Sequence, residues 1–126
     1  MFVLLEHATA NGIHWDFILE IPGKPLWPTW RLSDNPILPP TTISAIPIAD
    51  HPPRFRDYEG PLRQGRGSVR RVDRGDSIVH VCENCCMLAT LQGHHLHGQY
   101  EIIRHGAEAF VFRAIVPPIA PTSLQA

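Results

Sequence analysis

The chain has 126 residues, the length of one domain, and its formal net charge of -1 provides no global positive field of the kind that marks many nucleic-acid-binding proteins. Hydrophobic residues make up 44% and charged residues 18%, which excludes a disordered polyelectrolyte and supplies enough apolar material for a core. No run reaches the roughly 18 apolar residues of a membrane span, so no membrane association is expected. The absence of a basic leader and the clustering of three cysteines favour the reducing cytoplasm.

Short runs rich in β-branched and aromatic residues alternate with prolines and glycines along the whole chain, which favours strands over helices. The expected strands, in chain order, are residues 2–7, 14–21, 27–32, 44–49, 68–73, 77–82, 87–91, 99–104 and 109–115. Residues 36–40 and the tail, 117–126, are expected to be irregular. We therefore predict an all-β fold: one domain over residues 1–116 that forms a small antiparallel β-barrel with short connecting turns and little helix.

The turn between the first two expected strands is the most informative stretch. Asn11-Gly12 is a strong hairpin signal, because a type I′ turn needs positive φ at both central residues. Such a turn pairs His7 with Asp16, and His14 shares their face of the hairpin. Two imidazoles and a carboxylate within about 5 to 8 Å can hold one divalent metal. The alternative is that these are ordinary polar residues on the wet face of a hairpin.

A second polar cluster follows the fourth expected strand. Pro52 and Pro53 end that strand and leave His51 at a strand-to-loop junction, where a side chain can reach into a site. Arg54 and Arg56 could hold phosphate oxygens through bidentate hydrogen bonds. The alternative is a surface histidine beside solvated arginines.

The three cysteines form a third cluster. Cys82, Cys85 and Cys86, together with His94, could supply four ligands for a structural zinc ion. Their spacing matches no standard zinc finger, so a reversible disulfide and inert hairpin residues are alternatives, and we expect the inert outcome.

Five motifs, in order from about Phe2 to Arg113, resemble one known family. They are His7 with His14-Trp15-Asp16-Phe17-Ile18-Leu19-Glu20, Asp50-His51-Pro52 with Tyr58-Glu59-Gly60, Gly67-Ser68-Val69 with Val72-Asp73-Arg74-Gly75, Leu96-His97-Gly98-Gln99-Tyr100 with Ile103-Arg104, and Phe110-Val111-Phe112. They resemble the 3′-phosphoesterase domain of bacterial DNA ligase D and its free-standing relatives.

The resemblance implies a compact β-barrel and a manganese-dependent activity that trims 3′-ribonucleotides and 3′-phosphates from DNA ends during end joining. It implies that His7, His14 and Asp16 bind Mn²⁺, with Zn²⁺ or another divalent metal as the alternative. His51 would act on the phosphate side, so that His51, His14 and Asp16 form the catalytic set. The expected partners are DNA or RNA/DNA 3′ ends and separately encoded repair polymerase and ligase enzymes, and the domain is expected to be a monomer.

The chain departs from the family pattern where phosphate contacts are expected. Ile18 replaces an arginine, six residues instead of five separate the first two histidines, and the segment 41–49 has no basic residue. A Lys-Gly pair after the tryptophan strand is also missing. All basic residues except Lys24 are arginines, and the candidates for the phosphate contacts are Arg54, Arg56, Arg70 and Arg71.

Two functions of other classes are alternatives. The same barrel could bind DNA ends or partner proteins of a repair complex with weak catalysis or none, which the missing basic residues favour. An iron oxygenase with His14, Asp16 and His51 as its facial triad is less compatible with the ordered match to the phosphoesterase family.

Overall fold

The computed structural model describes residues 1–37, 42–107 and 109–115. The strands in these ranges are β1 (Phe2–Thr9), β2 (Gly12–Leu19), β3 (Trp27–Leu32), β4 (Ile43–His51), β5 (Gly60–Pro61), β6 (Ser68–Glu83), β7 (Cys86–Gly93), β8 (His97–Arg104) and β9 (Phe110–Ala114). Two short 3₁₀-helices, η1 (Pro53–Arg56) and η2 (Arg63–Gly65), lie between β4 and β6. Residues 38–40 of the stretch expected to be irregular, and the tail, 117–126, lie outside the described residues. Among those that are described, no helix is long and apolar enough to cross a membrane.

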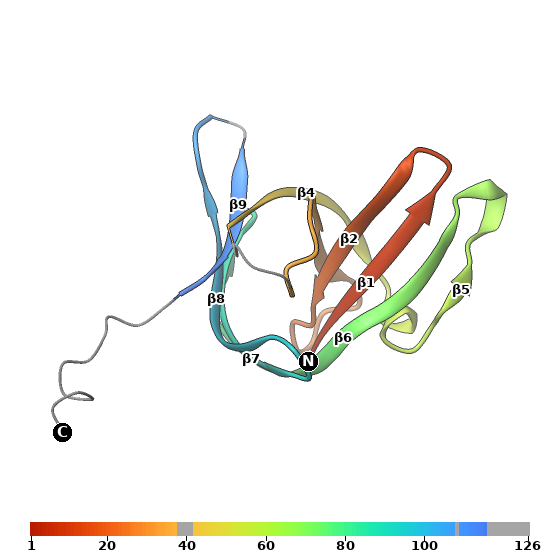
Figure 1. The fold of residues 1–126 in the computed structure, drawn as a ribbon. Coiled ribbons are helices and arrows are strands. Elements are labelled where there is room, and N and C mark those ends of the chain that lie inside the picture. The colour runs from red at the N-terminus through yellow and green to blue at the C-terminus, as the bar shows by residue number, and fades with distance from the viewer. Residues whose placement is uncertain (38–41, 108, 116–126) are drawn as a thin grey trace, which may run out of the picture.

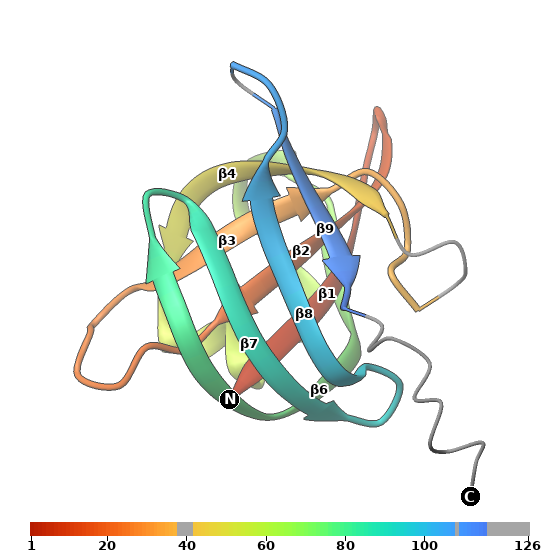
Figure 2. The ribbon, with the colours of Figure 1, turned by 90° about the vertical axis from the view of Figure 1, so that its left-hand side faces the viewer.

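All the strands belong to one antiparallel sheet that curls into a ring (Figures 1 and 2). Their order is β1-β2-β3-β4-β9-β8-β7-β6-β5, and a further pairing of β1 with β6 closes the ring. The all-β prediction is confirmed, but the ring is not a strict barrel, because β6 changes its partner along its length. Its first half pairs with β1 and its second half pairs with β7. The β1–β2 hairpin, β5 and the first half of β6 therefore project to one side of the ring (Figure 1).

The two strands predicted over 68–73 and 77–82 are one continuous strand, β6. Gly75, in the stretch between them, pairs with Phe2 of β1 and with Gly93 of β7. A Cβ atom at this glycine would lie 2.0 Å from the carbonyl oxygen of Gln92, so only glycine allows the neighbouring strand to approach this closely. Gly75 is therefore the point at which β6 passes from one partner to the other.

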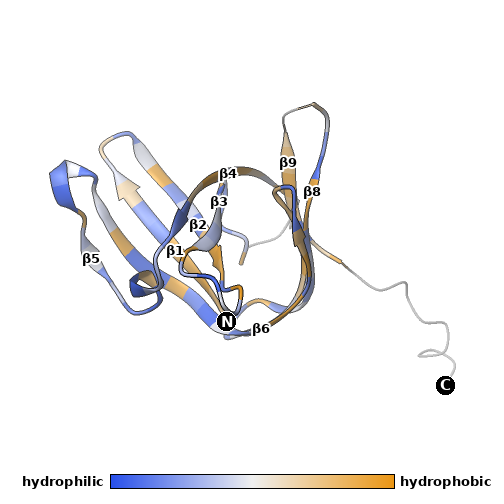
Figure 3. Cartoon of the chain, turned by 180° about the vertical axis from the view of Figure 1, so that it is seen from behind, coloured by the Kyte–Doolittle hydropathy of each residue, from blue (hydrophilic) through white to orange (hydrophobic). Residues whose placement is uncertain are grey.

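Apolar side chains are buried on both faces of β1 and β2, because successive side chains of a strand point to opposite faces. Figure 3 shows the resulting alternation of hydrophilic and hydrophobic residues along the strands. The larger cluster includes Phe2, Leu4, Phe17, Leu19, Trp30, Leu32, Ile43, Met87, Leu91, Leu96, Ile102 and Phe112. The smaller cluster, on the other face, consists of Val3, Leu5, Ile18, Trp27, Phe55 and Val69.

The smaller cluster fixes the segment that follows β4. Pro52 and Pro53 cannot continue a strand ladder, and Pro53 begins η1 with the fixed φ that a first helical position requires. Phe55 of η1 is 9% exposed and belongs to the smaller cluster. Its burial holds η1 against the outer face of β1 and β2, next to the polar ends of these two strands.

The buried carboxylate of Asp73 holds the connection between β7 and β8. Its Oδ1 accepts hydrogen bonds from the backbone N–H groups of Arg74 and His94, at 2.8 and 2.7 Å. Its Oδ2 accepts from the N–H groups of His95 and Leu96, at 3.1 and 2.8 Å. One side chain that is 3% exposed thereby satisfies three backbone donors of the β7–β8 connection and the N–H of Arg74 in β6.

We predict that Asp73→Asn destabilises the fold by about 2–4 kcal/mol, because the amide nitrogen that replaces one oxygen cannot accept the two hydrogen bonds made there. The expected fall in melting temperature is roughly 8–15 °C. Asp76→Asn is the matched control on the exposed part of the same strand and should stay within about 0.5 kcal/mol of the parent. Equal melting temperatures for the two variants would contradict the assigned role of Asp73.

Candidate metal centre

His7, His14 and Asp16 converge at one end of the β1–β2 hairpin. One possible ligand atom from each residue lies within 4.8 Å of the others. The register differs from the prediction: His7 lies opposite His14, and Asp16 lies opposite Leu5. The predicted pairing of His7 with Asp16 is therefore wrong by two residues. A shift of two positions keeps every side chain on its face, so the predicted convergence is still found.

The turn of this hairpin explains the shift. Thr9 pairs with Gly12, so the two loop residues are Ala10 and Asn11. Of these four residues only Gly12 has a positive φ, +128°, which rules out the predicted type I′ turn on Asn11-Gly12. The Thr9 hydroxyl closes the loop instead: it accepts from the Asn11 N–H at 3.1 Å and donates to the Gly12 carbonyl at 3.0 Å.

A backbone carbonyl orients the ring of His7. Its Nε2 lies 2.7 Å from the carbonyl oxygen of Arg66. Because a carbonyl can only accept, Nε2 carries a hydrogen, and Nδ1 is the ring atom left to act as a metal ligand. The carbonyl can reach His7 because the next residue is Gly67 (φ +84°), where a Cβ atom would lie 1.9 Å from the Ala8 carbonyl oxygen.

Asp16 is 3% exposed, yet its Oδ1 accepts no hydrogen bond from any described residue. The nearest cationic or imidazole nitrogens are Nε2 of His14 and Nε of Arg31, each 3.6 Å from Oδ1. Nδ1 of His7 lies 3.8 Å from Oδ2. A buried carboxylate oxygen without a hydrogen bond is costly, and a bound cation would offset that cost.

The spacing of these atoms fits a divalent metal. Nδ1 of His7 and Nε2 of His14 are 2.9 Å apart, and their distances to Asp16 are 3.8 and 3.6 Å. Ligand atoms at about 2.1 Å from one tetrahedral or octahedral ion lie about 3.0–3.4 Å from one another. Two imidazoles and one carboxylate also leave positions open for other ligands. The predicted ligand set therefore has the chemistry that suits such an ion, and its separations lie within about 0.4 Å of those that one ion requires.

Burial lowers the pKa of His14 below its ordinary value of 6.5. The charges of Arg31 and His7 lower it further, and the Asp16 carboxylate opposes them. The lowered pKa keeps the imidazole neutral, the form that binds a metal, at and above pH 6.5. Stability linked to this group is present above pH 6.5 and is lost as the pH falls through the lowered value.

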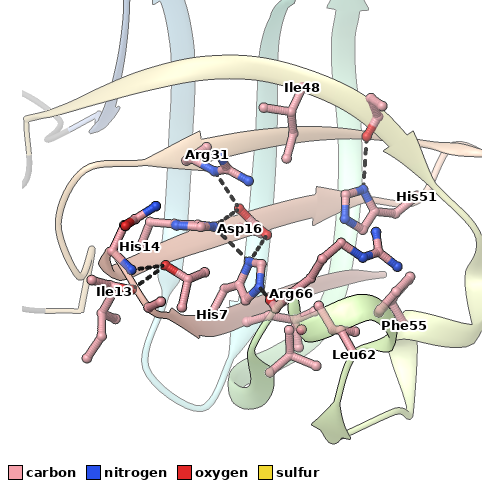
Figure 4. A pocket seen from close by; sticks show the side chains of 18 of the residues that line it. His7, Ile13, His14, Asp16, Arg31, Ile48, His51, Phe55, Leu62 and Arg66 are labelled. Carbon is pink, nitrogen blue, oxygen red and sulfur yellow. Dashed lines mark hydrogen bonds and ion pairs between the residues drawn. The ribbon is translucent and has the colours of Figure 1, made fainter.

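A cavity of about 880 Å³ connects these three residues with His51 (Figure 4). His51 ends β4, and its Nδ1 donates to the carbonyl of Ala49 at 2.9 Å. Its ring meets the ring of Phe55 edge-on, with centroids 5.1 Å apart. Both contacts fix the ring and leave Nε2 free of protein partners among the described residues. His51 is not in the group of close ligand atoms, so the facial triad of the oxygenase alternative is not formed.

Of the four arginines predicted to contact phosphate, Arg54 lines this cavity and the other three do not. Each of the three is paired with a carboxylate elsewhere: Arg56 with Asp57 at 3.3 Å, Arg70 with Glu6 at 3.1 Å, and Arg71 with Glu59 at 3.7 Å. Surface pairs of this kind contribute little stability, but they occupy the guanidinium groups.

Sequence reasoning missed two arginines that line the cavity, Arg31 and Arg66. Arg31 lies opposite Asp16 in the pairing of β2 with β3, so the lateral order of these strands would have revealed it. Arg66 stands in the loop before β6, and no local pattern pointed to it. Ile18, where the family pattern has an arginine, is 1% exposed within the smaller apolar cluster.

The cysteines lie at the opposite end of a strand from His94. Asn84 and Cys85 form the tip of the β6–β7 hairpin and have positive φ values of 52° and 64°, which defines a type I′ turn. Cys86 directly follows this turn, Cys82 lies two residues before it, and all three thiols are free. His94 follows the far end of β7, so β7 separates it from the turn. Among the described residues, the group with ligand atoms close enough for a metal is the one formed by His7, His14 and Asp16.

Comparison with known proteins assigns the chain to a family. Residues 5–104 match the family described as the DNA Ligase D 3′-phosphoesterase domain. The chain is 32% identical over 109 residues, 79% of its length, to the "Multifunctional non-homologous end joining protein LigD" of Pseudomonas aeruginosa. The aligned part is 13% of that relative. The chain therefore belongs to the DNA ligase D 3′-phosphoesterase domain family, and the resemblance found in its sequence is confirmed.

We predict that the protein binds one equivalent of Mn²⁺ and that His14→Ala and Asp16→Asn each weaken the affinity at least 100-fold in calorimetric titration, because each removes a ligand. His80→Ala is the matched control, since His80 is exposed and bonds to Thr90 outside the cavity. The metal-free Asp16→Asn protein should melt at or above the parent temperature, because the variant removes an unpartnered buried charge. Unchanged Mn²⁺ affinity in both ligand variants would refute the assignment.

We also predict that Cys85→Gly stabilises the fold by about 0.4–1 kcal/mol, because glycine adopts the positive φ of this turn position without strain. The hydrogen bond from Trp30 Nε1 to the carbonyl of residue 85 is retained, since it uses the backbone. A structural zinc ion bound by the cysteines would produce the opposite result, a lower melting temperature with loss of the metal.

Proposed function

We propose that this protein is a metal-dependent 3′-phosphoesterase that removes 3′-phosphates and 3′-ribonucleotides from DNA ends during end-joining repair. The observation that supports this most is that His7, His14, Asp16 and His51 line one cavity. Family membership supplies the reaction class, and this cavity supplies residues with the chemistry that phosphoester hydrolysis requires. DNA or RNA/DNA 3′ ends are the proposed substrates.

His7, His14 and Asp16 would hold the metal, which we propose is Mn²⁺, with Zn²⁺ or another divalent ion as the alternative. A divalent ion at this position supplies Lewis acidity toward a phosphate oxygen and makes a water molecule more acidic. The Arg66 carbonyl orients the ring of His7, and burial lowers the pKa of His14, which favours its neutral, metal-binding form. The protein also keeps Asp16 away from bulk water, where its charge has a stronger effect on a bound cation.

His51 would act on the phosphate side of the cavity. Because its Nδ1–H donates to the Ala49 carbonyl, Nε2 is the atom left to contact substrate. When the ring is protonated, Nε2 donates a hydrogen bond to a phosphate oxygen or a proton to the leaving oxygen. The edge contact with Phe55 limits rotation of the ring, so the donor is positioned before substrate binds.

Arg54 is the member of the predicted arginine set that we retain as a phosphate contact. Arg54 belongs to η1 and lines the cavity. Its guanidinium lies 4.9 Å from the centroid of the Phe55 ring. Stacking on an aromatic ring reduces the freedom of the side chain and leaves its N–H groups available for an anion.

A DNA-end-binding module with little turnover is the second candidate. The observation that favours it is the pairing of Arg56, Arg70 and Arg71 with carboxylates outside the cavity. Each missing arginine contact costs on the order of 2–4 kcal/mol in a phosphoryl-transfer transition state. We therefore expect slow turnover compared with relatives that have a complete set of basic residues.

The test is a gel assay on primer-templates that end in a 3′-phosphate or a 3′-ribonucleotide, with and without Mn²⁺. We predict slow Mn²⁺-dependent product formation by the parent protein. His51→Ala should reduce the rate at least 100-fold, because it removes a positioned donor, and should leave Mn²⁺ affinity unchanged. His80→Ala should retain the parent rate. If no product forms at enzyme excess while the same DNA is bound, the binding-module function is correct.

A further inference from the structure

The arginines that line the cavity differ in their partners from most of those outside it. Those outside the cavity with a carboxylate within 4 Å are Arg56, Arg70, Arg71, Arg74 and Arg113, at distances from 2.6 to 3.7 Å. The three that line the cavity, Arg31, Arg54 and Arg66, make no hydrogen bond to a carboxylate of the described chain. By the same 4 Å limit Arg31 has Asp16 beside it, at 3.6 Å, whereas no carboxylate of the described residues is paired with Arg54 or Arg66. These two arginines therefore bring unpaired positive charge to the cavity wall, and Arg31 stands beside a carboxylate without a hydrogen bond to it.

Of the three cavity-lining arginines, Arg31 lies closest to the candidate metal ligands. It projects from β3 beside Asp16 of β2 (Figure 4). Its Nε is buried and has no hydrogen-bond partner, although the side chain as a whole is 41% exposed. The distance of 3.6 Å from Nε to Asp16 Oδ1 is too long for a hydrogen bond. On its other side Arg31 pairs with Ile46 of β4, which offers no charge.

An arginine and an aspartate this close normally form a direct hydrogen-bonded pair, which satisfies both groups. Here Asp16 Oδ1 and Arg31 Nε are both buried and both unpartnered. The two atoms have opposite requirements, since the carboxylate needs a cation or a donor and the guanidinium needs an acceptor. A divalent cation bound by Asp16 satisfies only the first and repels the second. A cation together with an anion that contacts both satisfies the two.

We propose that Arg31 is a phosphate-binding residue whose guanidinium holds the oxyanion that contacts the metal held by His7, His14 and Asp16. The ligand class is a tetrahedral dianion such as a terminal phosphate monoester. Arg31 lines the cavity, and its planar guanidinium can bind two oxygens of such a group at once. The inference rests on the metal site of the proposed function, but it does not require turnover.

Another role would be structural: Arg31 could act only by orienting Asp16. The two roles predict opposite effects on metal binding when the charge of Arg31 is removed. If Arg31 binds the anion, its loss removes a cation from beside the metal, so metal affinity stays the same or increases. If Arg31 orients Asp16, its loss weakens metal binding.

The experiment is a pair of calorimetric titrations on the intact protein and on Arg31→Gln: Mn²⁺ alone, and then sulfate, a tetrahedral dianion that is not hydrolysed, into the Mn²⁺-loaded protein. We expect sulfate affinity to fall tenfold or more in Arg31→Gln, while Mn²⁺ affinity is unchanged or higher. Arg31→Lys keeps the charge without the planar fork and should lose an intermediate amount. Arg113→Gln is the matched control, because Arg113 has a similar exposure, 47%, and is paired with Glu101 away from the cavity.

Three results would overturn the proposal: unchanged sulfate affinity in Arg31→Gln, a parallel loss of Mn²⁺ affinity, or no sulfate binding by the Mn²⁺-loaded parent. None of these depends on catalysis. A protein that binds sulfate through Arg31 and forms no product in the gel assay would retain the inference and lose the proposed enzymatic function. If the Arg31→Gln variant forms product at the parent rate and binds sulfate with the parent affinity, the proposed enzymatic function is retained and the inference about Arg31 is lost.

Discussion

The strict alternation of side chains along β1 and β2 is the constraint on which the rest of the molecule depends. Phe2 and Leu4 pack in the larger apolar cluster, while Val3 and Leu5 pack in the smaller one on the other face. A shift of the strand by one residue would exchange these faces and place each set of side chains in the cluster that the other set now fills. The same alternation places His7, two residues beyond Leu5, on the face of the smaller cluster. The alternation that buries the apolar side chains of β1 therefore also places the candidate metal ligand His7.

The site is assembled from several segments that are distant in the sequence. The hairpin supplies three potential ligands, but β3 supplies Arg31, the end of β4 supplies His51, and the loop before β6 supplies the carbonyl that orients His7. Phe55 connects these parts, because it is buried in the smaller cluster and contacts the ring of His51. Apolar packing therefore positions the polar side chains, which have few direct hydrogen bonds to one another.

Local signals in the sequence predicted the strands well, and the reasons are visible in particular residues. Composition and turn residues located most of the strands, and the motif around His14 and Asp16 led to the correct face of the hairpin. The register was misjudged because Asn11-Gly12 has the composition of a type I′ turn, whereas the Thr9 hydroxyl stabilises a different loop. Arg31 was missed because its proximity to Asp16 depends on which strands are lateral neighbours, a property that no local pattern encodes.

The division of β6 between two partners has a consequence for the order of structural opening. Its first half meets β1 through residues far apart in the chain, such as Ala8 and Ser68, whereas its second half forms a local hairpin with β7. Pairings between distant segments carry the larger loop-closure cost and form later in folding. We expect the amide protons of the β6–β7 hairpin and those of the β1–β6 pairing to exchange through two different opening events. The Arg66 carbonyl that orients His7 lies just before this part of β6. Each opening of the β1–β6 pairing would therefore also break the hydrogen bond to His7. A cation bound by His7 would then slow hydrogen exchange along the whole pairing of β1 with β6.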